Sequence, residues 1–174
     1  LVKYPNNFNH IDLLVNDWLA LLINIFSFSY GPDINMKPTC PACRRDCSFT
    51  KKMTEIECTM ANIENETYRE PFVAAPLPMS GDQIQYKLLR VRDMQKIEEY
   101  KLASKSREEK DPTETCALAH HIISINNRAD HSLLNRMEWV KEAIGGDLRD
   151  LRNQIKENET GYDLKQNVAC PHCS

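Results

Sequence analysis

Apolar residues crowd one segment near the start of the chain, and their spacing predicts a helix over residues 11–28. Asn9 stands before it as an N-cap, and Asp12 places an acid in the first turn, where it opposes the helix dipole. Gly31 then ends the helix. The apolar residues cover more than one face, which exceeds what packing in a small monomer requires. We therefore expect a protein partner to cover the side that carries Trp18, Leu22, Ile25 and Phe26.

The same apolar run is too short to cross a membrane. Its uncharged part extends from Trp18 to Tyr30, whereas a bilayer requires about 20 apolar residues. The preceding segment is polar and lacks the pattern of a cleavable signal peptide. We expect neither a signal peptide nor a stable membrane span.

Short extended pieces are predicted after this helix. Between residues 34 and 73 the helical period disappears, which favours small antiparallel strands. A Ser80-Gly81-Asp82 turn signal precedes an alternation of apolar residues at positions 84, 86 and 88. The segment that ends in this turn and the strand that follows it together predict a hairpin.

Helical periodicity returns in the second half of the chain. One helix is predicted over residues 92–104, and Asp111 and Pro112 are start signals for a second. The glycine pair at 145 and 146 is expected to separate the last two helices, and Gly161 to end the last one. The expected inner stripes are Leu118, Ile122 and Ile125; Leu133, Met137, Val140 and Ile144; and Leu148, Leu151 and Ile155.

One unit of sequence recurs: a helix, a glycine that stops it, a short extended segment and then Cys-Pro-x-Cys. Gly31, Asp33, Cys40 and Cys43 recur at one common offset as Gly161, Asp163, Cys170 and Cys173. A Cys-x-x-Cys turn places two thiolates on one side of a tight loop, and two such knuckles supply the four ligands that zinc prefers. We predict one structural zinc held by Cys40, Cys43, Cys170 and Cys173, closing a loop of roughly 130 residues.

Other roles for the cysteines remain open. Each Cys-x-x-Cys could instead be a dithiol redox pair or a pair of uncoordinated thiols. Cys47 and Cys58 could replace a ligand or serve as small core residues, and Cys116 is expected to pack. We expect His172, inside the second knuckle, to be exposed.

Composition narrows the function classes. The chain has 174 residues and 20.1 kDa, enough for one compact domain or two small ones. Its 22 basic and 25 acidic residues give a net charge of -3, which argues against binding nucleic acid by bulk charge. Seven cysteines cannot all pair within one chain, so a reducing cytosol suits the sequence better than a disulfide framework.

Other candidate chemistry is sparse. His120 and His121 are adjacent on a predicted helix and point to different sides, so one buried and one exposed histidine is expected. No nucleotide-binding loop, nucleophile elbow or H-E-x-x-H motif occurs. The basic stretch from Lys87 to Lys110 is interpreted as a solvated helix face, with phosphate contact as the alternative.

The arrangement resembles small baseplate hub and hub-assembly proteins of T-even-type contractile-tailed bacteriophages. The resemblance is carried by Tyr30-Gly31-Pro32, the Cys40-Pro41-Ala42-Cys43 knuckle, Leu77-Pro78-Met79-Ser80-Gly81, the Gly146-Asp147-Leu148-Arg149-Asp150-Leu151 segment, Gly161-Tyr162-Asp163 and the Cys170-Pro171-His172-Cys173 knuckle. Arg44 departs from it, because a glycine is commoner after the first knuckle. The resemblance implies a structural protein without enzymatic activity, oligomeric in its assembly, that contacts other tail proteins in the virion baseplate after assembly in the host cytoplasm.

Together these patterns predict an α+β protein: a helical bundle with small antiparallel β segments and a zinc-ribbon-like site built from the two knuckles. We expect one zinc-stapled domain over residues 1–174. Residues 1–75 would carry the first helix, knuckle and strands, and residues 76–174 the hairpin, later helices and second knuckle. A zinc-ribbon module that presents Arg44, Arg45, Lys51 and Lys52 to nucleic acid is the main alternative, and a thiol oxidoreductase is the third.

Overall fold

A computed structural model of the chain describes residues 9–59, 70–105, 112–129, 131–163 and 168–173. It confirms an α+β protein with small antiparallel sheets. The chain forms two compact units, unit 1 from residues 1–15 and 62–159 and unit 2 from residues 16–61 and 160–174. The two units therefore alternate along the sequence, and residues 62–159 of unit 1 lie between the two segments of unit 2. The single zinc-stapled domain over residues 1–174 stays a prediction.

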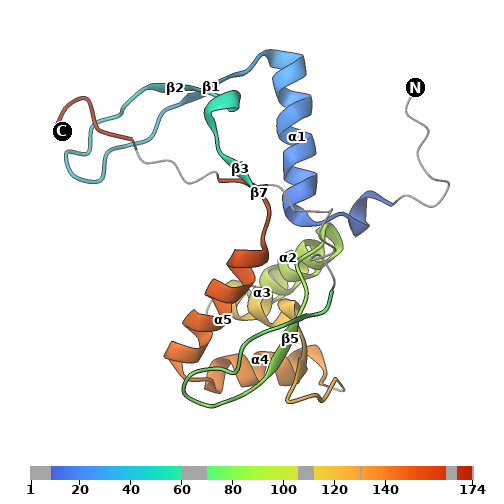
Figure 1. Cartoon of the computed structure of the whole chain (residues 1–174). Helices are drawn as coiled ribbons and strands as arrows, with labels where there is room; N and C mark the ends of the chain where they lie inside the picture. The colour runs from blue at the N-terminus through green and yellow to red at the C-terminus, as the bar shows by residue number, and fades with distance from the viewer. Residues whose placement is uncertain (1–8, 60–69, 106–111, 130, 164–167, 174) are drawn as a thin grey trace. The chain divides into compact units, whose positions relative to one another are not determined.

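Among its described residues, unit 1 combines four α-helices (Figure 1) with a three-stranded antiparallel sheet, in which β5 (Ile84–Tyr86) pairs with both β4 (Phe72–Val73) and β6 (Ile122–Ile125). The helices contact one another and the sheet supplies part of their core, so a purely helical bundle is not confirmed. The elements are β4 (Phe72–Val73), β5 (Ile84–Tyr86), α2 (Val91–Lys105), α3 (Thr113–His121), β6 (Ile122–Ile125), α4 (Leu133–Glu142) and α5 (Gly145–Asn158), and a 3-10 helix (His10–Asp12) precedes them.

The core of unit 1 follows the predicted alternation along β5. Ile84, Tyr86 and Leu88 are buried, and β4 pairs with β5 to form the expected hairpin. The hydroxyl of Tyr86 donates to the Gln154 carbonyl oxygen at 2.9 Å, so this buried polar group is satisfied. From the predicted inner stripes of the helices, Leu118, Met137, Val140, Leu151 and Ile155 all reach this core.

The first predicted helix begins later than expected. The 3-10 helix comes first, with the Asn9 side chain accepting from the Ile11 N–H, and α1 (Val15–Tyr30) follows it. The break has a tertiary cause, because the Val15 N–H donates to the Leu89 carbonyl and the Val91 N–H donates to the Leu13 carbonyl. These bonds hold residues 13–15 extended against the start of α2, which overrides the helical pattern of the sequence.

The helix predicted to carry Ile122 and Ile125 ends before both residues. α3 ends at His121, and residues 122–125 form β6, which pairs with β5. Isoleucine is branched at Cβ and favours a strand, so the pairing of these residues with β5 prevails over their helical spacing in the sequence. Pro112 precedes the helix as its N-cap residue instead of opening it, and Asp111 lies outside the described residues.

The glycine pair does not separate two helices, because α5 begins at Gly145 itself. Ile144, predicted for the inner stripe of α4, is 48% exposed and is the N-cap residue of α5. A Cβ atom on Gly146 would lie 3.0 Å from the Met79 sulfur. Gly146 thus allows a close approach, and the next residue, Asp147, accepts from the backbone N–H groups of Met79 and Ser80 at 2.8 and 3.0 Å.

Unit 2 contains nearly all of α1 together with two small antiparallel pairs of strands. β1 (Asp33–Met36) pairs with β2 (Phe49–Lys52), and β3 (Cys58–Thr59) pairs with β7 (Gly161–Tyr162); a 3-10 helix spans Met53–Glu55. Gly31 ends α1 at a φ of +96°, as predicted. α5 ends at Asn158, so Gly161 is a strand residue and not the end of that helix.

Candidate metal centre

The first knuckle lies in the loop of the β1–β2 hairpin. The Arg44 N–H donates to the Cys40 carbonyl at 2.8 Å, and the Cys40 N–H donates to the Arg45 carbonyl at 2.9 Å. A further bond joins the Cys47 N–H to the Pro38 carbonyl at 3.0 Å. Arg44 has a φ of +56°, a left-handed conformation that glycine adopts without strain, so the residue that departs from the resemblance occupies a turn position suited to glycine.

The second knuckle is brought to unit 2 by the pairing of β7 with β3. The Asp163 N–H extends this pairing by donating to the Glu57 carbonyl at 2.9 Å. Gly161 makes a close approach possible here, because a Cβ atom on it would lie 2.9 Å from the Cβ of Asn16 and its φ is +121°. The strand therefore delivers residues 168–173 to the same unit as the first knuckle.

The four predicted ligands converge. The Sγ atoms of Cys40, Cys43, Cys170 and Cys173 all lie within 4.8 Å of one another. Each knuckle contacts the other: Cys40 Sγ lies 3.7 Å from Cys173 Sγ, and Cys43 Sγ lies 3.7 Å from Cys170 Sγ. Two knuckles that lie far apart in the sequence thus form one four-sulfur cluster.

The separations suit a tetrahedral zinc ion. Zn–S bonds of about 2.3 Å place neighbouring sulfurs of a tetrahedron about 3.8 Å apart. The two contacts of 3.7 Å between the knuckles match this edge, and thiolate is the donor that structural zinc sites use most. The four cysteines are therefore close enough to bind a metal ion and are compatible with zinc.

Backbone N–H groups of both turns stabilise the thiolate form of the first cysteine in each knuckle. The His172 N–H donates to Cys170 Sγ at 3.4 Å and lowers the pKa of Cys170 to about 6. The N–H groups of Cys43 and Ala42 likewise lower the pKa of Cys40. Hydrogen bonds with the neighbouring sulfurs, first that of Cys170, raise the pKa of Cys173 to about 12, because they favour its protonated thiol. A bound cation would displace this proton, so metal binding and proton release are coupled.

The other cysteines have different surroundings. Cys47 is buried and its Sγ lies 3.6 Å from Cys170 Sγ. Burial, followed by the adjacent Cys170 sulfur, raises the pKa of Cys47 to about 11. Cys58 is exposed on β3, and Cys116 is fully buried in the core of unit 1, which agrees with a packing role. His172 is exposed, as predicted.

The predicted partner-binding residues lie on an uncovered helix face. No residue of α1 is buried, and Trp18, Leu22, Ile25 and Phe26 are all exposed. The half-buried positions Asn16, Leu19, Ala20, Ile23 and Ser27 follow one side of the helix, so the exposed apolar residues occupy the opposite side. Asp17, in the first turn, is the sole charged residue of α1.

Unit 1 holds a buried polar cluster around α2. The Asp93 carboxylate accepts from Lys87 Nζ at 2.6 Å and from the Arg90 N–H at 3.0 Å, which closes the first turn of α2. Burial alone would raise the pKa of Asp93, but the hydrogen bond and charge of Lys87 lower it overall. His120 Nδ1 lies 3.8 Å from this carboxylate. The spacing of these residues in the sequence did not reveal the cluster.

Both adjacent histidines are buried, at 7% and 8% exposure, so the prediction of one exposed histidine is wrong. The cause is the end of α3: His121 is its last residue, and its Nδ1 lies 2.8 Å from the Lys87 carbonyl oxygen. A carbonyl only accepts, so Nδ1 carries the proton in this contact. Burial lowers the pKa of both histidines.

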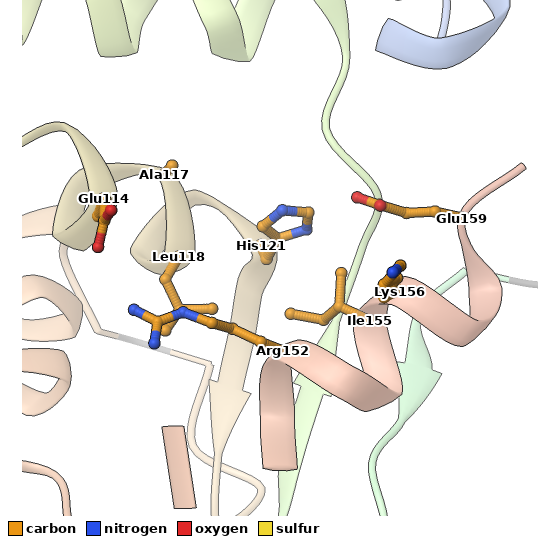
Figure 2. A pocket seen from close by; sticks show the side chains of 8 residues that line it. All are labelled: Glu114, Ala117, Leu118, His121, Arg152, Ile155, Lys156 and Glu159. Carbon is orange, nitrogen blue, oxygen red and sulfur yellow. The ribbon is translucent and has the colours of Figure 1, made fainter. Parts of the chain in front are cut away.

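A small cavity of about 250 Å³ lies between α3 and α5 (Figure 2). His121 lines it together with Glu114, Ala117, Leu118, Arg152, Ile155, Lys156 and Glu159. Its acidic and basic residues are balanced in number, and its volume lies below the roughly 300–1,000 Å³ of typical ligand pockets. The cavity therefore does not match a typical small-molecule site.

The buried histidines make unit 1 sensitive to acid. Their folded-state pKa values lie below the usual value of about 6.5, so as the pH falls through 6.5 the unfolded chain takes up protons first. We expect the free energy of unfolding to drop by at most about 1.4 kcal/mol per pH unit for each histidine. Urea unfolding between pH 7.5 and pH 5 measures this slope. His121→Gln should reduce it and the exposed-site control His10→Gln should not; equal slopes in both variants would contradict the assignment.

No protein-family model, curated protein or solved structure matches the chain. No helix in the described part of the chain combines the length and apolar character needed to cross a membrane.

Proposed function

We propose that this protein is a structural component or assembly factor of a bacteriophage tail baseplate hub, held by one structural zinc ion and acting through protein–protein contacts. The observation that carries the proposal is the four-sulfur cluster. Four thiolates saturate a tetrahedral zinc ion and leave no position for a substrate or water, which is the composition of a structural site. The resemblance in sequence supplies the phage tail as the setting.

The zinc-ribbon-like character of the site is part of this proposal. In unit 2, one knuckle is the loop of a hairpin and the other follows a paired strand, so the ion would join two β elements. Such an ion fixes the geometry of a unit with few buried apolar residues: among its described residues, Cys47, Met53 and Ile56 are the buried hydrophobic side chains. A unit of this size commonly relies on a metal for stability.

The contact surface that we propose is the exposed apolar side of α1. Trp18, Leu22, Ile25 and Phe26 recur at helical spacing, as expected for a helix that lies in an apolar groove of another protein. The scarcity of charge on α1 favours a buried interface. The proposed partner is another hub subunit with a complementary apolar groove, and the protein would be oligomeric in that assembly.

Incorporation into tails tests this function. We expect the double variant Leu22→Asp, Phe26→Asp to be absent from purified tail particles, because two buried carboxylates would oppose the contact. Mass spectrometry of tails assembled with the variant in place of the wild-type chain measures incorporation. Asn24→Asp, which adds a charge at a polar position of the same helix, is the matched control and should be incorporated. The double variant should keep its zinc; loss of zinc as well would show that these residues belong to the core.

The nucleic-acid alternative draws on the exposed Arg44 and Arg45, which lie in the same loop as the first knuckle. Basic side chains on a loop held by a metal ion can contact the phosphates of a nucleic acid. The net charge of -3, however, provides no general attraction for nucleic acid. A filter-binding titration against salt separates the two functions. Binding with a steep negative salt slope would support this alternative over hub assembly.

A further inference from the structure

Cys47 lies beside the proposed metal centre without belonging to its four predicted ligands. Its Sγ is 3.6 Å from Cys170 Sγ, essentially the separation found between the paired ligands Cys43 and Cys170. The residue is 4% exposed and is anchored through its N–H to the Pro38 carbonyl. A fifth sulfur therefore stands at ligand spacing next to a site that accepts four.

We propose that Cys47 is an alternative ligand of this metal centre and replaces Cys173, so that the ion is then held by Cys40, Cys43, Cys47 and Cys170. This inference rests on the proposed function, because it requires the metal site. A substitute for Cys173 keeps the existing Cys47–Cys170 contact as one edge of the tetrahedron. If Cys47 replaced Cys170 instead, its sulfur would have to move into the position that the Cys170 sulfur occupies, and this contact would be lost.

Accessibility identifies Cys173 as the ligand that is exchanged. Cys173 is the exposed member of the cluster, whereas Cys40, Cys43 and Cys170 are half-buried. A thiol that reagents or competing ligands reach first is the one most readily removed. With Cys47 in place of Cys173, three of the four ligands (Cys40, Cys43 and Cys47) belong to the β1–β2 hairpin loop. Cys170 is then the one ligand from the second knuckle. The end of the second knuckle could then be released without loss of the ion.

A metal titration with full-length variants tests the exchange. We expect Cys173→Ser to bind one zinc equivalent and, with cobalt(II), to keep the charge-transfer intensity of four thiolates. Cys47→Ser should do the same through Cys173. The double variant Cys47→Ser, Cys173→Ser should lose about a quarter of that intensity, and its metal affinity should fall by more than about 100-fold, beyond the loss of an outer-shell partner. Cys58→Ser, at an exposed cysteine, is the control.

Two results overturn the inference and are distinguishable. If Cys173→Ser shows three thiolates and the added Cys47→Ser changes nothing, Cys47 only packs or donates its S–H to Cys170. If the wild-type chain binds no metal, the proposed function fails as well. Should Cys173→Ser not fold, limited alkylation of zinc-loaded Cys58→Ser protein replaces it. Modification at Cys173 should then leave the ion bound, and should release it when Cys47→Ser is also present; release in both proteins would contradict the exchange.

Discussion

Replacing Cys170 and Cys173 together by serine should reduce the zinc content of the purified full-length protein from about one equivalent per chain to about none. The cluster takes two sulfurs from each knuckle, so this variant keeps Cys40 and Cys43 and, even with Cys47 as a substitute ligand, has at most three thiolates, whose weaker binding should not retain zinc through purification. Elemental analysis per mole of protein measures the change. Cys58→Ser should keep a full equivalent. A full equivalent retained by the double variant would place the ion among Cys40, Cys43, Cys47 and Cys58 instead of between the knuckles.

The same variant should lose the fold of unit 2 while keeping that of unit 1. Structural zinc sites contribute about 10–16 kcal/mol of apparent binding energy at neutral pH, as much as the whole stability of a typical domain. Unit 1 has its own core, and none of its described residues belongs to the cluster. Hydrogen exchange should therefore show lost protection in β1, β2, β3 and β7 and retained protection in β5 and β6. Loss of protection in both units would show that the metal stabilises the whole chain.

Truncation of Leu151 to alanine should destabilise unit 1 by about 2–5 kcal/mol. Leu151 is 0% exposed and belongs to the cluster of side chains between the helices and the sheet, so its loss leaves a cavity. Denaturant unfolding followed by the fluorescence of Trp139, in a Trp18→Phe background, reports on this unit. The matched control is Leu134→Ala on α4, 60% exposed, which should change the free energy of unfolding by about 0.5 kcal/mol or less. Similar values for both variants would contradict the assigned core.

Local signals were sufficient for much of the fold. α2 spans Val91–Lys105, against the predicted 92–104, and the β4–β5 hairpin forms where the turn residues and the alternation place it. These elements depend on neighbouring residues: apolar spacing, proline and glycine at the turn, and buried positions on one side of a strand. The errors occurred where distant residues decide the outcome. Backbone bonds from Leu13 and Val15 to residues 89–91 delay α1, and pairing with β5 makes residues 122–125 a strand.

The convergence of the four cysteines was predictable because the Cys-Pro-x-Cys knuckle occurs twice in the sequence. A single Cys-x-x-Cys gives two ligands, and the coordination number of zinc requires two more, so the repeat itself predicts convergence. Cys47 is less evident, since it lies outside the Cys-Pro-x-Cys motif that the repeat brings to attention. The contact of Asp147 with the Met79 and Ser80 N–H groups was also unpredicted. Such contacts depend on tertiary arrangement, which spacing does not encode.

The position of residues 62–159 of unit 1 between the two segments of unit 2 imposes an order on biosynthesis. At about 5–20 residues per second, ribosomes make Cys40 and Cys43 on the order of ten seconds before Cys170 and Cys173. During that interval the first knuckle has only its own hairpin and Cys47 close in sequence, while residues 62–159 can collapse into their own core. The nascent chain would thus carry an incomplete set of thiolates until residues 170–173 have been made. A product terminated before Cys170 would lack the second half of the site and the sulfurs that complete the cluster.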